Sequence, residues 1–370
     1  MKILLLAGEE SGVLYARDIA AKLRVADPAV EIRGYGDYGF ETADLAVMGF
    51  VAVLKKIFYF LRVSRTMKRA IDEWKPDAVC TVDYPGLNLK LAAYAKSRGI
   101  RAVHVVCPQV WAWKAGRIPK IEAALDRLCC FFPFEPALFK PGFATFVGHP
   151  LAEAFAGEEG RGGGRGREGG DKIVALLPGS RLGEIGRNLP TMLEALARLE
   201  GVRAVIPAAN DRAYEAISRL LATQTPPNPN TPTPSVAVTH GGARELLREA
   251  DCAVVASGTA TLEAALARCP TILVYRVSAF LYWFGRMVIK GIRHIGLANI
   301  IAEKTDLEPP MPELIQGDFT AEAVVNGLKP WLTDSAAHAA AARRLDTVVR
   351  KLGTGEGAMD NIAREVLAGK

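Results

Sequence analysis

Short apolar runs alternate with longer amphipathic stretches through the first half of the chain. Residues 3–7 (ILLLA), 78–82 and 102–106 are almost wholly apolar, which is typical of strands buried on both faces of a sheet. Residues 11–25 and 88–97, which separate these runs, have the length and mixed composition of helices. Such alternation predicts a parallel sheet with helices on both faces.

The same alternation restarts in the second half of the chain. We expect strands at 173–177, 202–207, 252–255 and 271–275, and helices at 182–199 and 261–267. From Thr320 onward the sequence is rich in alanine, which favours helices. The pattern therefore predicts an α/β protein with two doubly wound, Rossmann-like domains and a helical C-terminus. We expect a ligand cleft between the domains, because doubly wound folds bind ligands at the carboxyl ends of their strands.

An abrupt change of composition separates the two halves. The segment 157–170, GEEGRGGGRGREGG, contains no residue that could join a hydrophobic core and is typical of a flexible linker. We therefore place an N-terminal domain at 1–155, a glycine-rich linker at 156–171, a second domain at 172–330 and C-terminal helices at 331–370.

The overall charge indicates which class of molecule the protein binds. The 46 Lys and Arg residues outnumber the 40 Asp and Glu residues, which gives a net charge of +6 and a pI near 9.0. A basic balance favours an anionic partner, such as a nucleotide, a nucleic acid or a membrane surface. The six cysteines form no CxxC pair, so we expect reduced core residues of a cytosolic protein rather than a disulfide framework or a zinc site.

One basic helix is unusually apolar. The segment 47–69 carries six cations with no acid between Lys55 and Arg69, and its apolar residues recur at helical spacing: Val47, Phe50, Val51, Leu54, Ile57, Phe58 and Leu61. A helix of this kind suits peripheral attachment to anionic lipid, and the alternative is an ordinary core helix with a solvated basic face. A second aromatic and basic run at 280–293 favours an amphiphilic anionic ligand over nucleic acid. The longest apolar run, 45–54, is shorter than the ~20 residues that cross a bilayer.

A loop of small residues in the second half could hold a phosphate. Residues 256–261 (ASGTAT) connect a strand to a helix, and small residues allow the backbone N–H groups of a helix N-terminus to approach an anion. The hydroxyls of Ser257, Thr259 and Thr261 could add donors, and Glu263 could accept hydrogen bonds from a ribose. The alternative is an ordinary capped helix with Glu263 as the capping partner.

Two further glycine-containing loops follow strands. In 176–181 (LLPGSR), Arg181 suits a diphosphate, although Ser180 and Glu184 could instead cap the next helix. The first strand leads into 7–12 (AGEESG), which does not match GxGxxG and lacks the lysine of a P-loop. The sequence therefore argues against a nicotinamide or ATP site.

Candidate chemistry in the first half also lies after strands. Asp83 directly follows the strand at 78–82, a position that suits a catalytic or substrate-binding carboxylate and also an ordinary turn residue. Trp111 and Trp113 could stack on a sugar or belong to the core. His149 lies at the predicted domain boundary and is a weaker candidate for catalysis.

Taken in order, ten sequence blocks resemble those of lipid-A-disaccharide synthases. They are AGEESG (7–12), LAVMGFVAVL (45–54), VDYPGLN (82–88), PQVWAWKAGRIPKI (108–121), FPFEPALF (132–139), FVGHPLAE (146–153), LLPGSRLGEI (176–185), ASGTATLEAAL (256–266), YRVS (275–278) and PELIQ (312–316). The resemblance implies a GT-B fold and an inverting transfer that needs no metal or other cofactor. It implies transfer of 2,3-diacylglucosamine from its UDP derivative to 2,3-diacylglucosamine 1-phosphate, at the inner face of a Gram-negative-type inner membrane and without nucleic acid.

The resemblance also implies roles for individual residues. Asp83 matches the family's essential aspartate and would be the base, with Arg181 and Asn299 as its catalytic partners. The nucleotide would contact Ser180, Arg181, Ser257, Gly258, Thr259 and Glu263. The acceptor and its acyl chains would contact Ser11, Val47, Phe50, Val51, Leu54 and Phe58.

The chain departs from the family at two acidic positions. Val13 and Gly86 stand where the family has acids near the expected acceptor, whereas the donor motifs match. Two alternatives therefore stay open: another GT-B enzyme that acts on a lipid-linked or UDP sugar, and a membrane-associated nucleotide-sugar binder without turnover.

Overall fold

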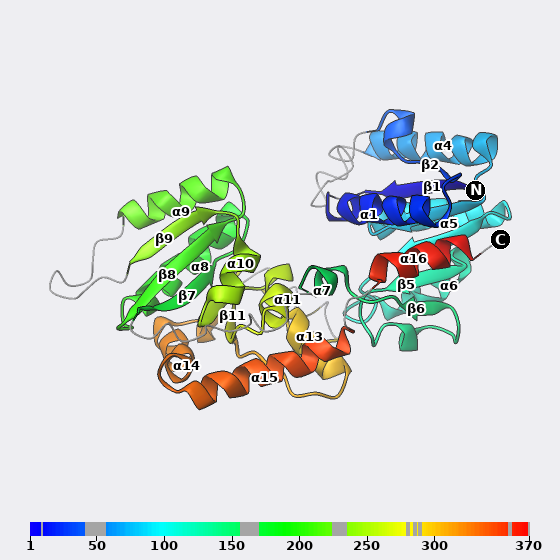
Figure 1. Ribbon diagram of the computed structural model, residues 1–370. Helices are drawn as coiled ribbons and strands as arrows, with labels where there is room; N and C mark the ends of the chain where they lie inside the picture. The colour runs from blue at the N-terminus through cyan, green and yellow to red at the C-terminus, as the bar shows by residue number, and fades with distance from the viewer. Residues whose placement is uncertain are drawn as a thin grey trace. The chain divides into compact units, whose positions relative to one another are not determined.

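The computed structural model contains two compact units, and the first is formed by two separate parts of the chain. Unit 1 comprises Met1–Ala154 and Leu352–Lys370, and unit 2 comprises Phe155–Lys351 (Figure 1). The structure describes residues 1–8, 10–40, 57–155, 170–223, 235–278, 282–283, 287, 291–353 and 357–368. Most of the predicted linker, residues 156–169, lies outside this description, as do residues 41–56.

Unit 1 is built on a parallel sheet of six strands in the order β2-β1-β3-β4-β5-β6. The strands are β1 (Lys2–Ala7), β2 (Glu31–Arg33), β3 (Ala78–Val82), β4 (Arg101–Val105), β5 (Arg127–Cys130) and β6 (Ala144–Phe146). The helices are α1 (Glu10–Ala26), α4 (Ile57–Trp74), α5 (Pro85–Ser97), α6 (Ile118–Ala124), α7 (Pro150–Phe155) and α16 (Ala358–Leu367), with short 3-10 turns at Gly36–Tyr38, Ala115–Arg117 and Pro136–Leu138.

Alternate residues of β1 explain why helices cover both faces of this sheet. Ile3 and Leu5 belong to a buried cluster with residues of α1 and α16. Leu4 and Leu6 belong to a second cluster with residues of α4 and α5. Side chains of a strand point alternately to opposite faces, so a continuous apolar run supplies both cores at once.

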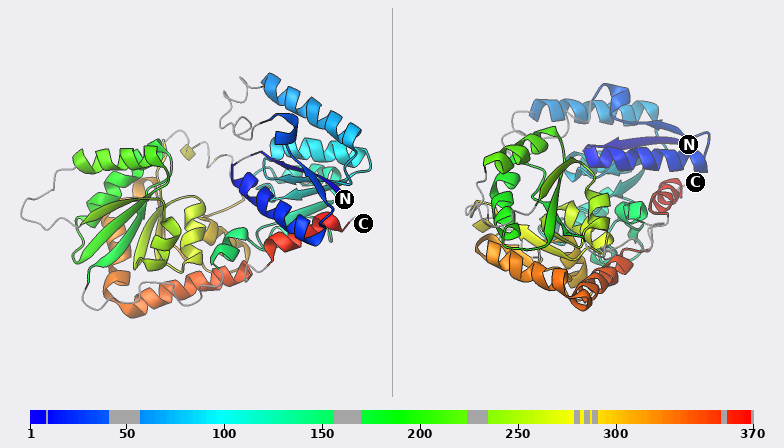
Figure 2. Two further views of the ribbon diagram at one scale, coloured as in Figure 1. Left: turned by 45° about the horizontal axis from the view of Figure 1, so that its top comes forward. Right: turned by 60° about the vertical axis from the view of Figure 1, so that its left-hand side comes forward.

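Unit 2 repeats this architecture with the strand order β12-β11-β10-β7-β8-β9, again all parallel. Its strands are β7 (Lys172–Leu177), β8 (Val202–Ala208), β9 (Val236–His240), β10 (Cys252–Ala256), β11 (Thr271–Tyr275) and β12 (Glu313–Ile315). Its helices are α8 (Leu182–Leu196), α9 (Asp211–Thr223), α10 (Ala243–Glu249), α11 (Thr259–Leu266), α13 (Leu297–Lys304), α14 (Ala321–Thr333) and α15 (Ser335–Lys351), with a 3-10 turn at Gln316–Asp318. Helices α8, α9 and α14 form one layer, and α11 packs with α10, α13 and α15 (Figure 2).

The predicted C-terminal segment is helical, but its helices belong to different units. Helix α15 packs against α11 of unit 2, whereas α16 packs against α1 of unit 1. Ion pairs of Lys22 with Asp360 at 2.7 Å and of Arg127 with Glu365 at 3.2 Å attach α16 to unit 1. Burial of Ile362 and Val366 against the sheet adds the apolar part of this attachment.

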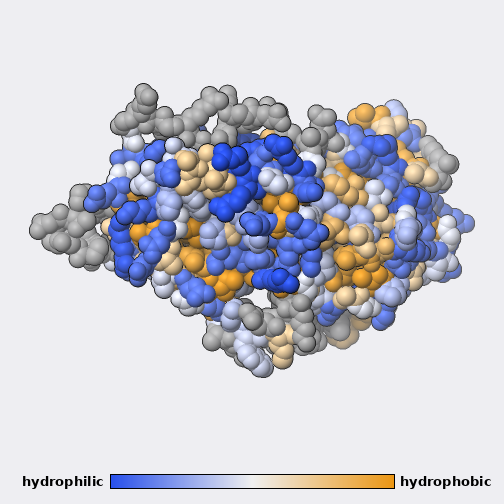
Figure 3. All heavy atoms as spheres, turned by 90° about the horizontal axis from the view of Figure 1, so that it is seen from below, coloured by the Kyte–Doolittle hydropathy of each residue, from blue (hydrophilic) through white to orange (hydrophobic). Residues whose placement is uncertain are grey.

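The sequence-based fold class is confirmed, and so is the prediction that the cysteines are core residues. All six cysteines are free and buried. None of the helices in the described part of the chain is long and apolar enough to cross a membrane. On the face shown in Figure 3, hydrophobic residues form several separate patches among hydrophilic ones, as is usual for the surface of a globular protein.

Candidate active site

Asp83 occupies a strained turn at the carboxyl end of β3. Asp83 and Tyr84 have φ angles of 50° and 51°, a left-handed conformation that costs about 1–3 kcal/mol per residue outside glycine. The Asp83 amide donates to the Val105 carbonyl at 2.9 Å, so the turn stays attached to β4. This strain presents a carboxylate at the sheet edge where doubly wound folds bind ligands.

The glycine loop after β1 makes room for this turn. A Cβ atom on Gly8 would lie 2.6 Å from the Tyr84 ring, and one on Gly12 would lie 3.8 Å from Asp83 Cβ. Close packing against the Tyr84 ring therefore explains why position 8 is a glycine. The side chain of Ser11 lies outside the described residues.

The environment of the Asp83 carboxylate alters its proton affinity. Burial raises the pKa of Asp83 above its ordinary value, because removing water disfavours the charged form. A hydrogen bond from the Tyr84 amide to Asp83 Oδ1, 2.8 Å long, acts in the opposite direction. A carboxylate with a raised pKa is a stronger base, which suits proton abstraction from a hydroxyl.

A buried polar cluster follows the next two strands. Trp111 is 8% exposed, so it belongs to the core, and its indole nitrogen donates to Glu135 at 3.0 Å. Glu135 also accepts from the Phe132 amide at 3.0 Å, and burial raises its pKa to about 7. Cys107, Cys130 and Glu135 place ligand atoms within 4.8 Å of one another, a spacing that could hold a metal ion. The carboxylate already has two protein donors, so the cluster is accounted for as a hydrogen-bonded core.

Of the other two candidates in the first half of the chain, Trp113 is exposed and His149 is buried. Trp113 is 38% exposed, and the Lys114 ammonium lies 4.2 Å from its ring centre. His149 is buried against the rings of Phe131 and Phe132 and accepts a hydrogen bond from the Leu151 amide at 3.1 Å. Burial lowers the pKa of His149 to about 4, so its imidazole is neutral at physiological pH.

Helix α4 has both buried and exposed apolar side chains. Its residues Val63 and Met67 are buried in the core. On another face Phe58 is 82% exposed and Leu61 is 45% exposed. The other apolar residues expected to contact acyl chains lie outside the described residues: Val47, Phe50, Val51 and Leu54.

In unit 2 the two candidate phosphate loops follow neighbouring strands. Strands β7 and β10 pair with Leu177 opposite Val255, so the loops containing Arg181 and Gly258 leave the same edge of the sheet. Helix α11 begins after Gly258, and no described side chain caps its N-terminus. In the described part of the chain, no heavy atom beyond the two flanking residues lies within 4 Å of a Cβ built on Gly258, so the loop is open at this position. This arrangement can accept an anion on backbone N–H groups.

The capping interpretation of this loop is wrong, because the side chains point elsewhere. Ser257 Oγ donates to the Ile295 carbonyl at 3.3 Å, and Thr261 Oγ1 donates to the Gly258 carbonyl at 2.8 Å. Thr259 is exposed. Glu263 accepts a hydrogen bond from Arg244 Nε at 3.0 Å instead of capping α11.

The loop of Arg181 does form a cap, with a different residue at its centre. Arg181 is the N-cap of α8, and its backbone amide and guanidinium both approach Glu184, at 3.4 and 2.7 Å. Ser180 is exposed beside it. The Arg181 side chain is 63% exposed, so its guanidinium is accessible to a ligand.

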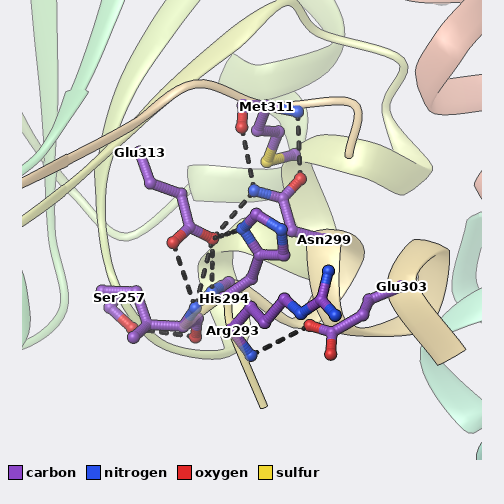
Figure 4. A network of polar contacts seen from close by, with 9 residues as sticks. Ser257, Arg293, His294, Asn299, Glu303, Met311 and Glu313 are labelled. Carbon is purple, nitrogen blue, oxygen red and sulfur yellow. Dashed lines mark hydrogen bonds and ion pairs between the residues drawn. The ribbon is translucent and has the colours of Figure 1, made fainter. Parts of the chain in front are cut away.

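Asn299 lies inside a hydrogen-bonded network rather than on the surface (Figure 4). Its Nδ2 donates to the Met311 carbonyl and to Glu313 Oε1, both at 2.8 Å, and its Oδ1 accepts from the Met311 amide at 3.0 Å. Glu313 also accepts from the amides of Ile295 and Gly296. Since the Ile295 carbonyl accepts from Ser257, the network joins Asn299 to the phosphate-loop candidate.

Two buried polar residues and one partly buried one make several hydrogen bonds, although no role for them was predicted from the sequence. Asn88, Glu135 and Glu313 each occur inside a block that carries the family resemblance. The signal that could have identified them is a single polar residue among apolar neighbours that burial requires to be paired. Partners such as Trp111 for Glu135 and Tyr35 for Asn88 are distant in sequence and could not be read from it.

Known proteins resemble this chain over most of its length. A family model described as "Lipid-A-disaccharide synthetase" matches residues 3–367. The lipid-A-disaccharide synthase of Syntrophus aciditrophicus (strain SB) is 37% identical to this chain over 340 residues, which cover 87% of this chain and 86% of that protein.

Two solved structures share the fold at low sequence identity. MurG of Acinetobacter baumannii matches with a TM-score of 0.58 and 15% identity, over 99% of each chain. CalG4, the calicheamicin glycosyltransferase, matches with a TM-score of 0.59 and 15% identity, over 100% of this chain and 98% of that chain. The two sheets with their helices therefore form a GT-B-like fold.

Proposed function

Because the chain belongs to the lipid-A-disaccharide synthetase family, we propose that unit 2 binds the nucleotide-sugar donor and that unit 1 supplies the base that activates the acceptor. The chain is a glycosyltransferase of lipid A biosynthesis with lipid-A-disaccharide synthase activity. Family membership implies UDP-diacylglucosamine and diacylglucosamine 1-phosphate as its substrates. The assignment of steps to residues below is our proposal.

The donor half of the proposal is supported by the paired loops after β7 and β10. The diphosphate would lie on the N-terminus of α11 at Gly258 and Thr259, with the guanidinium of Arg181 contacting its oxygens. Both groups stabilise negative charge as it develops on the departing UDP. Glu263 would contact the ribose from the first turns of α11. Its carboxylate would then accept hydrogen bonds from the ribose and from Arg244 at the same time.

Asn299 has a different role in this proposal from Arg181. Its amide is buried and hydrogen-bonded to Met311 and Glu313, so it would act by holding the segment around Ile295 that contacts Ser257. We therefore assign it a positioning role. Ser180, which is exposed beside Arg181, would contribute a hydroxyl donor to the nucleotide.

The observation that carries the acceptor half is the strained, partly buried Asp83 turn. The carboxylate would take the proton of the acceptor hydroxyl as that oxygen bonds to the anomeric carbon of the donor. The bond from the anomeric carbon to the UDP oxygen breaks at the same time, and UDP leaves with the electron pair. A single displacement of this kind inverts the anomeric configuration.

One assay tests the reaction as a whole. The protein is incubated with UDP-diacylglucosamine, with and without diacylglucosamine 1-phosphate, and both UDP and disaccharide are quantified. Release of UDP that depends on the acceptor and matches the disaccharide formed is the expected result. UDP release without disaccharide, or tight UDP binding without release, would favour the alternatives of a different sugar-nucleotide enzyme or a binder.

The acid side of the pH profile follows from the environment of Asp83. Its base form is the carboxylate and burial raises its pKa, so kcat/KM should fall as pH decreases through a midpoint above that of an ordinary aspartate. The measurement is kcat/KM against pH, with UDP affinity measured over the same range as the control for the donor site. A midpoint at or below the ordinary aspartate pKa would contradict this role.

Peripheral attachment to an anionic membrane surface is the second part of the proposal. Phe58, Leu61, Arg62, Arg65 and Arg69 recur at helical spacing on α4 and are all exposed. An exposed aromatic and aliphatic pair beside three cations suits insertion into lipid with the charges at the head groups. Both lipid substrates carry acyl chains, so such contact would bring the active site to them.

Exchanging the exposed apolar pair of α4 should weaken membrane binding. We expect Phe58→Ser with Leu61→Ser to lower partition onto vesicles of anionic phospholipid about tenfold or more, since burying each side chain contributes ~1.5–3 kcal/mol. Vesicle co-sedimentation measures this. Val25→Ser is the matched control, because Val25 is 80% exposed on α1 and has no assigned lipid contact. Equal partition of the double variant and the control would contradict the membrane role of α4.

A further inference from the structure

Asn88 lies in the first turns of α5, directly beneath the Asp83 turn. Its side chain is fully buried, although it is an amide in a unit whose core is apolar. Neither the motif that contains it nor the proposed reaction assigns it a role. A buried amide is costly unless all its hydrogen-bonding atoms have partners, so its partners indicate what it holds in place.

The amide nitrogen of Asn88 contacts three backbone carbonyls from two strands. It donates to Asp83 O at 2.8 Å, to Val82 O at 3.2 Å and to Leu6 O at 3.3 Å. Two N–H groups serve three acceptors, so one of them is shared. The contacts join the end of β1 to the end of β3 and continue onto the first residue of the strained turn.

The remaining atom of this amide is held by Tyr35. The Tyr35 hydroxyl donates to Asn88 Oδ1 at 2.7 Å, and Tyr35 is 3% exposed. The three carbonyls fix which end of the amide faces them, because an oxygen in place of the nitrogen would be repelled by all three, and the Tyr35 hydroxyl supplies the donor that the amide oxygen then needs. Tyr35 thus holds the oxygen end of the Asn88 amide in place, and the nitrogen end attaches to the carbonyl of Asp83.

The left-handed backbone at Asp83 and Tyr84 needs such support. A non-glycine residue keeps this conformation only where its surroundings determine it, and here two consecutive residues do so. The bond from Asn88 Nδ2 to Asp83 O acts on the peptide group between these two residues. Rotation of that peptide would also move the Tyr84 amide, which donates to the Asp83 carboxylate at 2.8 Å and holds it in its present position.

We infer that Asn88 and Tyr35 are positioning residues that hold the Asp83 carboxylate in its reactive orientation. This inference rests on the proposed role of Asp83 as the base. Neither residue contacts substrate in this proposal, so their loss should reduce kcat and leave substrate affinity unchanged. A purely structural role would instead lower the amount of folded protein and leave kcat per folded molecule as it was.

Tyr35→Phe tests the inference with the smallest change. It removes only the hydroxyl, so Asn88 keeps its carbonyl acceptors but loses the bond that holds its amide oxygen in place. We expect kcat per folded molecule to fall about tenfold, with KM for both substrates and the affinity for UDP unchanged. Tyr94→Phe is the matched control, because its hydroxyl bonds to Asp72 at the surface of the same unit. Folded protein is quantified by circular dichroism before each assay.

A double-mutant cycle separates failure of this inference from failure of the proposed function. In an Asp83→Asn background, Tyr35→Phe should cause no further loss of the residual rate, because the group that it orients is gone. Normal kcat in Tyr35→Phe with an inactive Asp83→Asn would overturn the inference and keep the base assignment. Full activity in Asp83→Asn would overturn both. A loss in Tyr35→Phe that persists undiminished in the Asp83→Asn background would also overturn the inference.

Discussion

Asp83→Asn is expected to abolish turnover while UDP binding stays at the level of the parent protein. Asparagine has nearly the same shape and can still accept the 2.8 Å hydrogen bond from the Tyr84 amide, but it cannot take a proton from the acceptor. General-base catalysis contributes about 10²–10⁴-fold, so kcat should fall by at least that factor. The donor is assigned to unit 2, which the substitution does not touch.

The measurement is kcat with both lipid substrates, together with UDP affinity by titration calorimetry. Asp72→Asn is the matched control, since Asp72 is an acid of the same unit that pairs with Arg98 at 3.2 Å on the surface. We expect the control to retain the parent rate. A near-normal rate in Asp83→Asn would exclude Asp83 as the base, and loss of UDP binding would show that the substitution acts beyond the acceptor site.

The central strands were predictable because their chemistry is local. Runs such as 3–7 and 252–255 are apolar at every position, and only a strand buried on both faces requires that. The edge strands β2 and β9 have no continuous buried run, so the signal that identifies the central strands does not find them. The same local logic places Asp83 at a strand end and Arg181 at a helix start.

The contacts that give the candidate residues their roles could not be predicted in the same way. Asn299 was expected to be a catalytic residue, and the structure buries it against Met311 and Glu313. Glu263 was considered as a cap, and it pairs with Arg244 from a different helix. Each of these partners is distant in sequence, so composition and spacing carry no information on them. A motif thus identifies which residues matter more readily than what they contact.

The two units differ in how their candidate residues are held. The position of Asp83 depends on a strained backbone that Asn88 stabilises through a hydrogen bond. Substitutions that disturb this hydrogen bond should therefore lower the rate of the reaction. Arg181 instead is exposed and bound to Glu184 by a surface ion pair, which contributes only about 0–1 kcal/mol. A diphosphate offers the same guanidinium more charge and more acceptor atoms than Glu184 does. Arg181 can therefore exchange one partner for the other at little cost.

Removing the Arg181 guanidinium should consequently affect the donor more than the fold. We expect Arg181→Ala to lower kcat/KM by about 10²–10³-fold, because the charge on departing UDP loses its strongest donor. UDP affinity should fall about tenfold or more, as one or more charge-assisted hydrogen bonds are lost. Arg181→Lys should recover part of both effects, since lysine keeps the charge but cannot form two parallel bonds to a phosphate.

Arg198→Ala is the matched control for this prediction. Arg198 follows α8 and pairs with Glu194 of that helix at 2.5 Å, with its side chain 51% exposed. The control thus removes a guanidinium and a surface ion pair of the same kind but away from the loop between β7 and α8. If both variants keep the parent UDP affinity and kcat/KM, the Arg181 pair only caps α8 and the diphosphate lies elsewhere. If only Arg181→Ala loses them, with an unchanged melting temperature, the loop between β7 and α8 binds the nucleotide.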